Sequence, residues 1–413
     1  MTVPYAHLPS LTRQVYELLA DHPGPDTTAF PVAAALGIGE QDAAAALQRL
    51  RAARLLDQHP PGDRYTIAPW ARLHATQRRA RLPNPARAEQ NTRLIDWYAA
   101  TASAAVPLLA RDAFRFSTPA KHETVPHDHG DGRRALHWYT WEHRVLRTIL
   151  TAAADRGRDD LALELAEATW HLARTTYHHD DLAHAQHTGH THTHQTRQPI
   201  AAVFRAREAS ALADLRHHEA ALGAAADAVT LAQDIDDPGI LALAYSHSGR
   251  VRLAAGDPDE ALHEFTTALR HYRTIVDNHG HALAQRRIGQ THLALGHPAD
   301  AVRFLDAASS ALTRAGNRLA AARAMTYLAD ALTADKQAPQ ALTAVGRAHG
   351  LLGNTAAPRY RAGLDLAAAR ARCALAEPTA ARRITDDLIR RLRHAGLGAA
   401  GDLAAATELH DRL

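Results

Sequence analysis

Residues 244–273 read AYSHSGRVRLAAGDPDEALHEFTTALRHYR, and residues 284–313 read AQRRIGQTHLALGHPADAVRFLDAASSALT. The two stretches start 40 residues apart, and small residues stand at matching places in both. Each has a central turn signal, GDP or GHP, between two helix-length segments. Because Gly commonly ends helices and Pro is favoured in a first helical turn, each stretch predicts a hairpin of two helices.

The small residues keep this period over five units. A helical hairpin needs small side chains where its helices approach to about 8–10 Å. We expect a degenerate sixth unit around residues 170–195, out of strict register. An unrelated alanine-rich bundle is the alternative, but it does not account for a fixed period. The three columns of small residues are Ala209, Gly249, Gly289, Ala329 and Ala369; Ala221, Ala261, Ala301, Ala341 and Ala381; and Ala228, Ala268, Ala308 and Ala348, with Leu388 in the last unit.

This pattern is similar to the tetratricopeptide repeat. The resemblance implies an α-α superhelix of about six hairpins over residues 161–413, which binds a partner on its concave side. The period exceeds the common 34 residues, so we expect longer helices. The predicted fold class is all-α.

The amino-terminal third predicts a winged helix-turn-helix over residues 1–82. We expect three helices, at 11–24, 31–39 and 40–58, and then a turn with a flanking strand in HPPGDRYTIAP, residues 59–69. Residues 83–160 are expected to be a helical connector with a His/Asp-rich loop at 117–134.

Together these segments resemble the carboxy-terminal half of actinomycete NB-ARC-type (AfsR-like) transcriptional regulators. The resemblance runs through AAALGIGEQDAAAALQRLRAARLLDQ and DRYTIAPWARLHA, then through RLIDWYAATASAAVPLL and HWYTWEHRVLRTILTAAADRG. It implies a regulatory role. The ATPase is missing, because neither Lys121 nor Lys336 lies in a Gly-Lys-Ser/Thr phosphate loop. The ATP-driven switching of those regulators is therefore not implied.

DNA binding by the winged helix stays open. The candidate nucleic-acid contacts are basic residues of the third helix and the wing. Glu40 and Asp42, in the first turn of the third helix, oppose a polyanion. Residues 8–80 contain eight Arg against seven acidic residues, which leaves a packing module as the alternative. The candidates are Arg49, Arg51, Arg54 and Arg64.

Two histidine-rich segments contain candidate metal ligands. His127, His129 and Asp131 lie in the 117–134 loop, and imidazole with carboxylate suits a transition metal. The other candidates, His187, His190 and His194, share one face if the segment is helical. Polar surface is the alternative in both places, and no bound cofactor is expected.

Composition narrows the class of protein. Formal charge is +3, the chain has one cysteine, Cys373, and no apolar run is long enough to span a bilayer. We expect a cytoplasmic protein. No nucleophile elbow or dinucleotide fingerprint supports catalysis. An enzyme of specialised metabolism nevertheless stays open, beside a regulator and a pure interaction scaffold.

The expected working surface is the groove lined by the first helix of each hairpin. Its ligand-facing positions lie three before and one after the small residue of that helix, with contributions from a neighbouring row. Arginine forks there suit carboxylates and other anions. We therefore expect an acidic peptide, a protein or an anionic small ligand, unless these arginines pair with acids of the groove itself. A homodimer is left open. The predicted groove residues are Ser210, Asp214, Ser246, Arg250, Arg286, Gln290, Arg323, Asp330 and Arg370.

Overall fold

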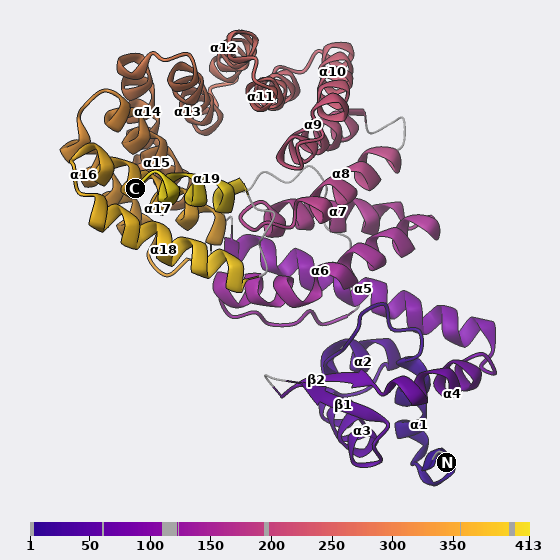
Figure 1. The fold of residues 1–413 in the computed structure, drawn as a ribbon. Helices are drawn as coiled ribbons and strands as arrows, with labels where there is room; N and C mark the ends of the chain where they lie inside the picture. The colour runs from indigo at the N-terminus through magenta and orange to yellow at the C-terminus, as the bar shows by residue number, and fades with distance from the viewer. Residues whose placement is uncertain are drawn as a thin grey trace. The chain divides into compact units, whose positions relative to one another are not determined.

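The computed structural model describes residues 4–59, 62–109, 122, 124–193, 198–355, 357–395 and 401–413. The chain divides into two compact units, residues 1–171 and 172–413 (Figure 1). In the described residues, no helix is long and apolar enough to cross a membrane.

The amino-terminal unit begins with short helices and a β-hairpin. Strands β1 and β2 are antiparallel, with Leu56 opposite Ile67, and Thr27 forms an isolated bridge to Tyr65. Tyr16, Leu47 and Leu50 are fully buried and form much of this core. The elements are η1 (Pro4–His7), α1 (Ser10–Leu18), α2 (Ala29–Leu36), α3 (Glu40–Ala52), β1 (Leu56–His59) and β2 (Arg64–Ile67).

The third helix is shorter than the sequence pattern predicts. It ends at Ala52, and residues 56–58, which we expected to be helical, belong to strand β1 instead. Arg54 has φ 57°, a left-handed conformation that stops a helix, and the Leu55 amide donates to the Leu50 carbonyl at 2.9 Å. Leu55 and Leu56 are both buried, but Leu55 directly precedes β1 and Leu56 begins it, so neither lies on a helix face. In so short an apolar segment, the spacing of apolar residues does not distinguish a helix from a strand.

Longer helices complete this unit. Helix α5 packs against α2 and α6. The Asp131 carboxylate accepts a hydrogen bond from the Arg134 amide and caps the start of α6. The elements are α4 (Pro69–Arg79), α5 (Asn84–Leu109), α6 (Gly132–Asp155) and α7 (Asp159–Ala173), whose last two residues lie beyond the unit boundary.

The carboxy-terminal unit is a series of helical hairpins. Figure 1 shows them following an arc, with α11 and α13 on its inner side and α12 and α14 on its outer side. Most of these helices are 17 residues long, which accounts for the long period. The elements are α8 (His179–Thr191), α9 (Gln198–Asp214), α10 (His218–Ile235), α11 (Pro238–Ala255), α12 (Pro258–Thr274), α13 (Asn278–Ala294), α14 (Pro298–Arg314), α15 (Arg318–Ala334), α16 (Ala338–Leu352), α17 (Pro358–Ala374), α18 (Pro378–His394) and α19 (Gly401–Asp411).

Polar caps set where several of these helices begin. Asp237, Asp257, Asp277 and Asn317 each accept a hydrogen bond from a backbone amide in the first turn of the following helix. They are spaced by 20 residues or a multiple of it, half the repeat. Since a capping side chain satisfies an amide that the helix leaves unpaired, these residues fix the register of each hairpin.

The columns of small residues lie between helices, as the sequence predicts. Every alanine in the three columns is fully buried, and both glycines are buried as well. A Cβ on Gly249 would lie 2.9 Å from the Phe265 ring, and one on Gly289 would lie 2.6 Å from Leu305 Cγ. The two helices of a hairpin therefore approach too closely there for a larger side chain.

The same substitution at two glycines should have opposite effects. Gly289→Ala should lower the free energy of unfolding by about 1–3 kcal/mol, because its methyl group overlaps Leu305 and must displace it. At Gly346 on α16, an added methyl group would have no atom within 4 Å. Gly346→Ala should therefore raise the free energy of unfolding by about 0.5–1 kcal/mol, since alanine restricts the unfolded chain. Denaturant unfolding measures both values, and equal shifts would contradict the close packing at Gly289.

Candidate functional site

The inner side of the arc is formed by α9, α11, α13, α15 and α17, and the predicted groove residues lie on these helices. Hairpin stacking brings equivalent positions of successive repeats side by side, so residues 40 apart in sequence become neighbours. Two clusters of charged groups result.

The first cluster is centred on Asp214, at the end of α9. Arg250 Nη2 lies 2.6 Å from Asp214 Oδ2. Arg359 donates to both carboxylate oxygens, at 3.1 and 3.0 Å. Burial alone would raise the pKa of Asp214, but the guanidinium groups of Arg250 and Arg359 hold it well below its usual range. Asp214 is therefore ionised and forms a largely buried bidentate pair.

His179 is the third neighbour of Asp214, with Nδ1 3.5 Å from Oδ2. Burial and the charge of Arg359 lower the pKa of His179 to about 4, so the ring is neutral near pH 7. Two arginines thus face one carboxylate, and this cluster carries excess positive charge.

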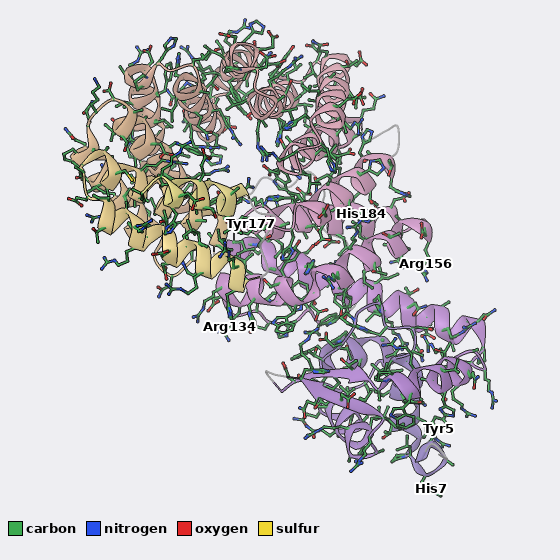
Figure 2. The ribbon with its side chains drawn as sticks, viewed as in Figure 1. Tyr5, His7, Arg134, Arg156, Tyr177 and His184 are labelled. Carbon is green, nitrogen blue, oxygen red and sulfur yellow. The ribbon has the colours of Figure 1, made fainter. Side chains whose placement is uncertain are left out.

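Contacts distant in sequence close the arc of the carboxy-terminal unit. Asp214 and Arg359 are 145 residues apart. Tyr177, just before α8, donates to Asp402 at 2.7 Å and packs with Leu366 and Leu392 (Figure 2). The first and last helices of this unit are therefore joined by polar and apolar contacts.

The second cluster, here called the inner cluster, comprises Arg286, Arg287, Arg323, Tyr327 and Tyr360. Arg286 and Arg287 both donate to Gln290 Oε1, at 3.1 and 3.4 Å. Arg323 donates to the Tyr360 hydroxyl at 3.3 Å and stacks on that ring, 5.0 Å from its centre. The guanidinium of Arg286 lies 5.9 Å from the centre of the Tyr327 ring.

No described carboxylate forms an ion pair with Arg286, Arg287 or Arg323. Burial and the nearby charge of Arg323 lower the pKa of Arg286 to about 9. Burial alone would raise the pKa of both tyrosines, yet Arg323 and its neighbours lower that of Tyr360 to about 7 and that of Tyr327 to about 8. The inner cluster therefore favours negative charge strongly.

The remaining predicted groove residues are satisfied locally. Arg370 pairs with Asp330 at 3.0 Å, as the alternative of internal pairing predicts. Arg250 follows the same alternative through Asp214, whereas Arg286 and Arg323 do not. Ser210 Oγ lies 2.6 Å from His247 Nδ1. The Ser246 side chain forms a hydrogen bond with Tyr272.

Sequence reasoning missed five residues of these clusters, His179 among them. Arg287 and Tyr327 lie two positions before the small residues Gly289 and Ala329. The same column contains Arg207 and His247 in the preceding repeats, so its polar character was a usable signal. Arg359 gave no such signal, because closure of the arc brings the start of α17 to the first cluster. Tyr360 contacts Arg323 of the adjacent hairpin from a position outside the predicted rows.

The first set of candidate metal ligands has other contacts. His129 Nε2 lies 3.1 Å from the Thr101 carbonyl, the His127 ring packs edge-on against Phe30, and Asp131 caps α6. The ligand atoms of His127, His129 and Asp131 do not all lie within 4.8 Å of one another. The three side chains therefore do not converge as ligands.

In the second set, His187 Nδ1 lies 2.9 Å from Glu208 Oε1, and His190 Nδ1 lies 3.3 Å from the Ala201 carbonyl. His194 lies outside the described residues. His187 and His190 each interact with a group on α9.

The candidate DNA contacts divide into two kinds. Arg49, Arg51 and Arg54 are exposed. Arg64 is buried, with Nη2 2.5 Å from Asp26 and 2.7 Å from Glu142. Arg64 therefore pairs within its own unit and does not face solvent as a wing residue would.

Comparison with known proteins identifies a tetratricopeptide repeat over residues 240–314. No curated protein matches the sequence. A signal transduction ATPase with numerous domains and a tetratricopeptide repeat sensor, from Pyrococcus horikoshii, is 15% identical with a TM-score of 0.47; the match covers 98% of this chain and 61% of that one. The chain thus spans about three fifths of that structure.

Two further solved structures are similar. A Rap protein complexed with competence and sporulation factor is 13% identical with a TM-score of 0.45, over 67% of this chain and 85% of that one. Aspartyl phosphate phosphatase F from Bacillus subtilis is 13% identical with a TM-score of 0.43, over 78% and 88%.

Tyrosine ionisation should report the charge of the inner cluster. We expect tyrosinate absorbance to rise between about pH 7 and 8, rather than only near the ordinary value of 10. Tyr360→Phe should remove the lower step. Because the folded protein releases this proton before the unfolded chain does, unfolding free energy should rise with pH between about 7 and 10 in the wild type. The rise should shrink in Tyr360→Phe.

Tyr5→Phe is the matched control, because burial raises the pKa of Tyr5. It should leave the step near neutral pH unchanged. Wild-type absorbance that stays flat up to about pH 9 would contradict the lowered pKa of Tyr360.

Proposed function

We propose that this tetratricopeptide-like repeat protein acts by binding an acidic peptide segment, or another anionic ligand, on the inner side of its arc. The supporting observation is a charge imbalance. Arg250, Arg286, Arg287, Arg323 and Arg359 lie there, and among the described residues they pair with one carboxylate, Asp214, while Arg370 and Asp330 balance each other.

Unbalanced, largely buried arginines are costly unless an anion approaches them. Arg286 is only 4% exposed, so little water reaches its guanidinium group. A carboxylate that reaches this surface replaces repulsion among arginines with charge-assisted hydrogen bonds. A repeat superhelix offers a long surface of this kind to an extended partner.

Arg286→Glu should weaken binding of an octaglutamate peptide to the full chain by roughly tenfold or more, because it adds a negative charge at the centre of the inner face. Isothermal calorimetry at low salt measures the affinity, and thermal unfolding checks that the variant folds. Arg303→Glu on α14 is the matched control, since Arg303 is 72% exposed and lies outside both clusters. Equal affinities in Arg286→Glu and the wild type would refute the proposal, as would the absence of wild-type binding.

Transcriptional regulation is a second candidate. It is favoured by the exposed Arg49, Arg51 and Arg54, which lie at the end of α3 and just beyond it, next in sequence to the β1–β2 hairpin. Against it, Arg64 of the hairpin is held by Asp26 and Glu142. The same contacts suit a winged helix that serves only as a packing module in an interaction scaffold.

Salt dependence separates these alternatives. A DNA-binding unit requires affinity for a mixed-sequence duplex that falls steeply with salt and falls again in Arg51→Glu. Fluorescence anisotropy with a labelled duplex measures both effects. If the wild type does not bind the duplex, or if Arg51→Glu binds it as well as the wild type does, DNA binding is refuted and the interaction scaffold is the remaining alternative.

A further inference from the structure

We propose that the inner cluster is a binding site for a phosphoryl group carrying two negative charges. This inference rests on the proposed function, because it names the ligand chemistry of the same face. It concerns Arg286, Arg287, Arg323, Tyr327 and Tyr360, and not the neighbouring Asp214 cluster.

Charge balance favours a dianion over a single carboxylate. Three guanidinium groups lie together, and the described residues offer them no carboxylate. The Asp214 carboxylate already pairs with Arg250 and accepts hydrogen bonds from Arg359 on both of its oxygens, so it is not available to the inner cluster. A single negative charge would leave two of the three cations uncompensated, whereas a phosphoryl dianion leaves one.

Donor geometry points to the same class of ligand. Arg286 and Arg287 follow one another on α13 and share one neutral acceptor, Gln290 Oε1. Arg286 is 96% buried, yet its Nε has no hydrogen-bond partner among the described residues. A buried N–H without a partner is costly, and a phosphoryl oxygen would satisfy it. The planar arginine fork matches two oxygens of one phosphoryl group.

The two tyrosines can act in two ways: as neutral hydrogen-bond donors to a bound anion, and as a source of negative charge when no anion is bound. Their hydroxyl groups can donate to phosphoryl oxygens, which are strong acceptors. The cations around Tyr360 are Arg174, Arg286, Arg323 and Arg359, and those around Tyr327 are Arg286, Arg287 and Arg323. Without a ligand, ionised tyrosine provides the negative charge that these cations favour. A bound dianion takes over that role, so the tyrosines regain their protons.

Calorimetry of the full chain with inorganic phosphate, and with acetate at the same ionic strength, tests the site directly. Phosphate should bind and acetate should bind roughly tenfold or more weakly. Phosphate should also reduce the tyrosinate absorbance at pH 8. Arg323→Lys keeps the charge but loses the fork, and should weaken phosphate binding without unfolding the protein. Arg303→Lys is the matched control and should bind as the wild type does.

Two phosphorylated probes distinguish the source of the group. Free O-phosphoserine and an uncharged peptide with one phosphoserine both carry it. Tighter binding of the peptide indicates a phosphorylated protein segment, and equal affinity indicates a small phosphate ester. Each outcome requires binding at the inner cluster and therefore supports the site.

Phosphate that fails to bind, binds no better than acetate, or binds Arg323→Lys as well as the wild type overturns this inference. If octaglutamate still binds in an Arg286-dependent way, the proposed function stands and only the phosphoryl site is lost. If neither probe binds, both proposals fail.

Discussion

Close approach of helices at residues with little or no side chain is the constraint on which the carboxy-terminal unit depends. Ala261 and Ala301 are fully buried, and Gly249 and Gly289 face the second helix of their own hairpins at distances that no Cβ could occupy without displacing a neighbour. Because this contact recurs every 40 residues, each hairpin stacks on the next with the same offset. The arc is the sum of those offsets, and it decides which side chains face inward.

The charged clusters follow from that stacking. Residues three before, two before and one after the small residue face the same side of the first helix, which brings Arg250, Arg286 and Arg287 together. Arg323 joins them from a neighbouring row of the next hairpin, so that up to 73 residues separate the four arginines. Isolated, they would repel one another. Closure of the arc offsets part of this repulsion by bringing Asp214 to Arg250 and Arg359. Within the described parts of the chain, the inner cluster has no such carboxylate, and the compensation found there is the acidity of Tyr327 and Tyr360.

The sequence predicted what depends on periodicity and missed what depends on closure. The hairpins, their long helices and the burial of the small residues follow from a local repeat that every unit obeys. The inward direction of Arg286 and Arg323 follows from the same register. The pairing of Asp214 with Arg359 depends instead on accumulated curvature over 145 residues, which no local pattern contains. In the amino-terminal unit, residues 56–58 form strand instead of the expected helix because a left-handed Arg54 follows the end of α3, and arginine is not a residue type that signals such a stop.

The choice of arginine on this face has a physical consequence. Only two lysines, Lys121 and Lys336, occur in the chain, and neither lies on α9, α11, α13 or α17. A lysine amine buried among like charges loses its proton readily, so a cluster of lysines would relax by becoming neutral. Arginine resists this, although burial and Arg323 lower the pKa of Arg286 to about 9. At neutral pH Arg286 therefore keeps its charge, and relief of the repulsion must come from an anion: a tyrosine that ionises or a ligand that enters. Because this surface keeps its positive charge, the charge of a ligand affects its affinity more strongly than its shape does.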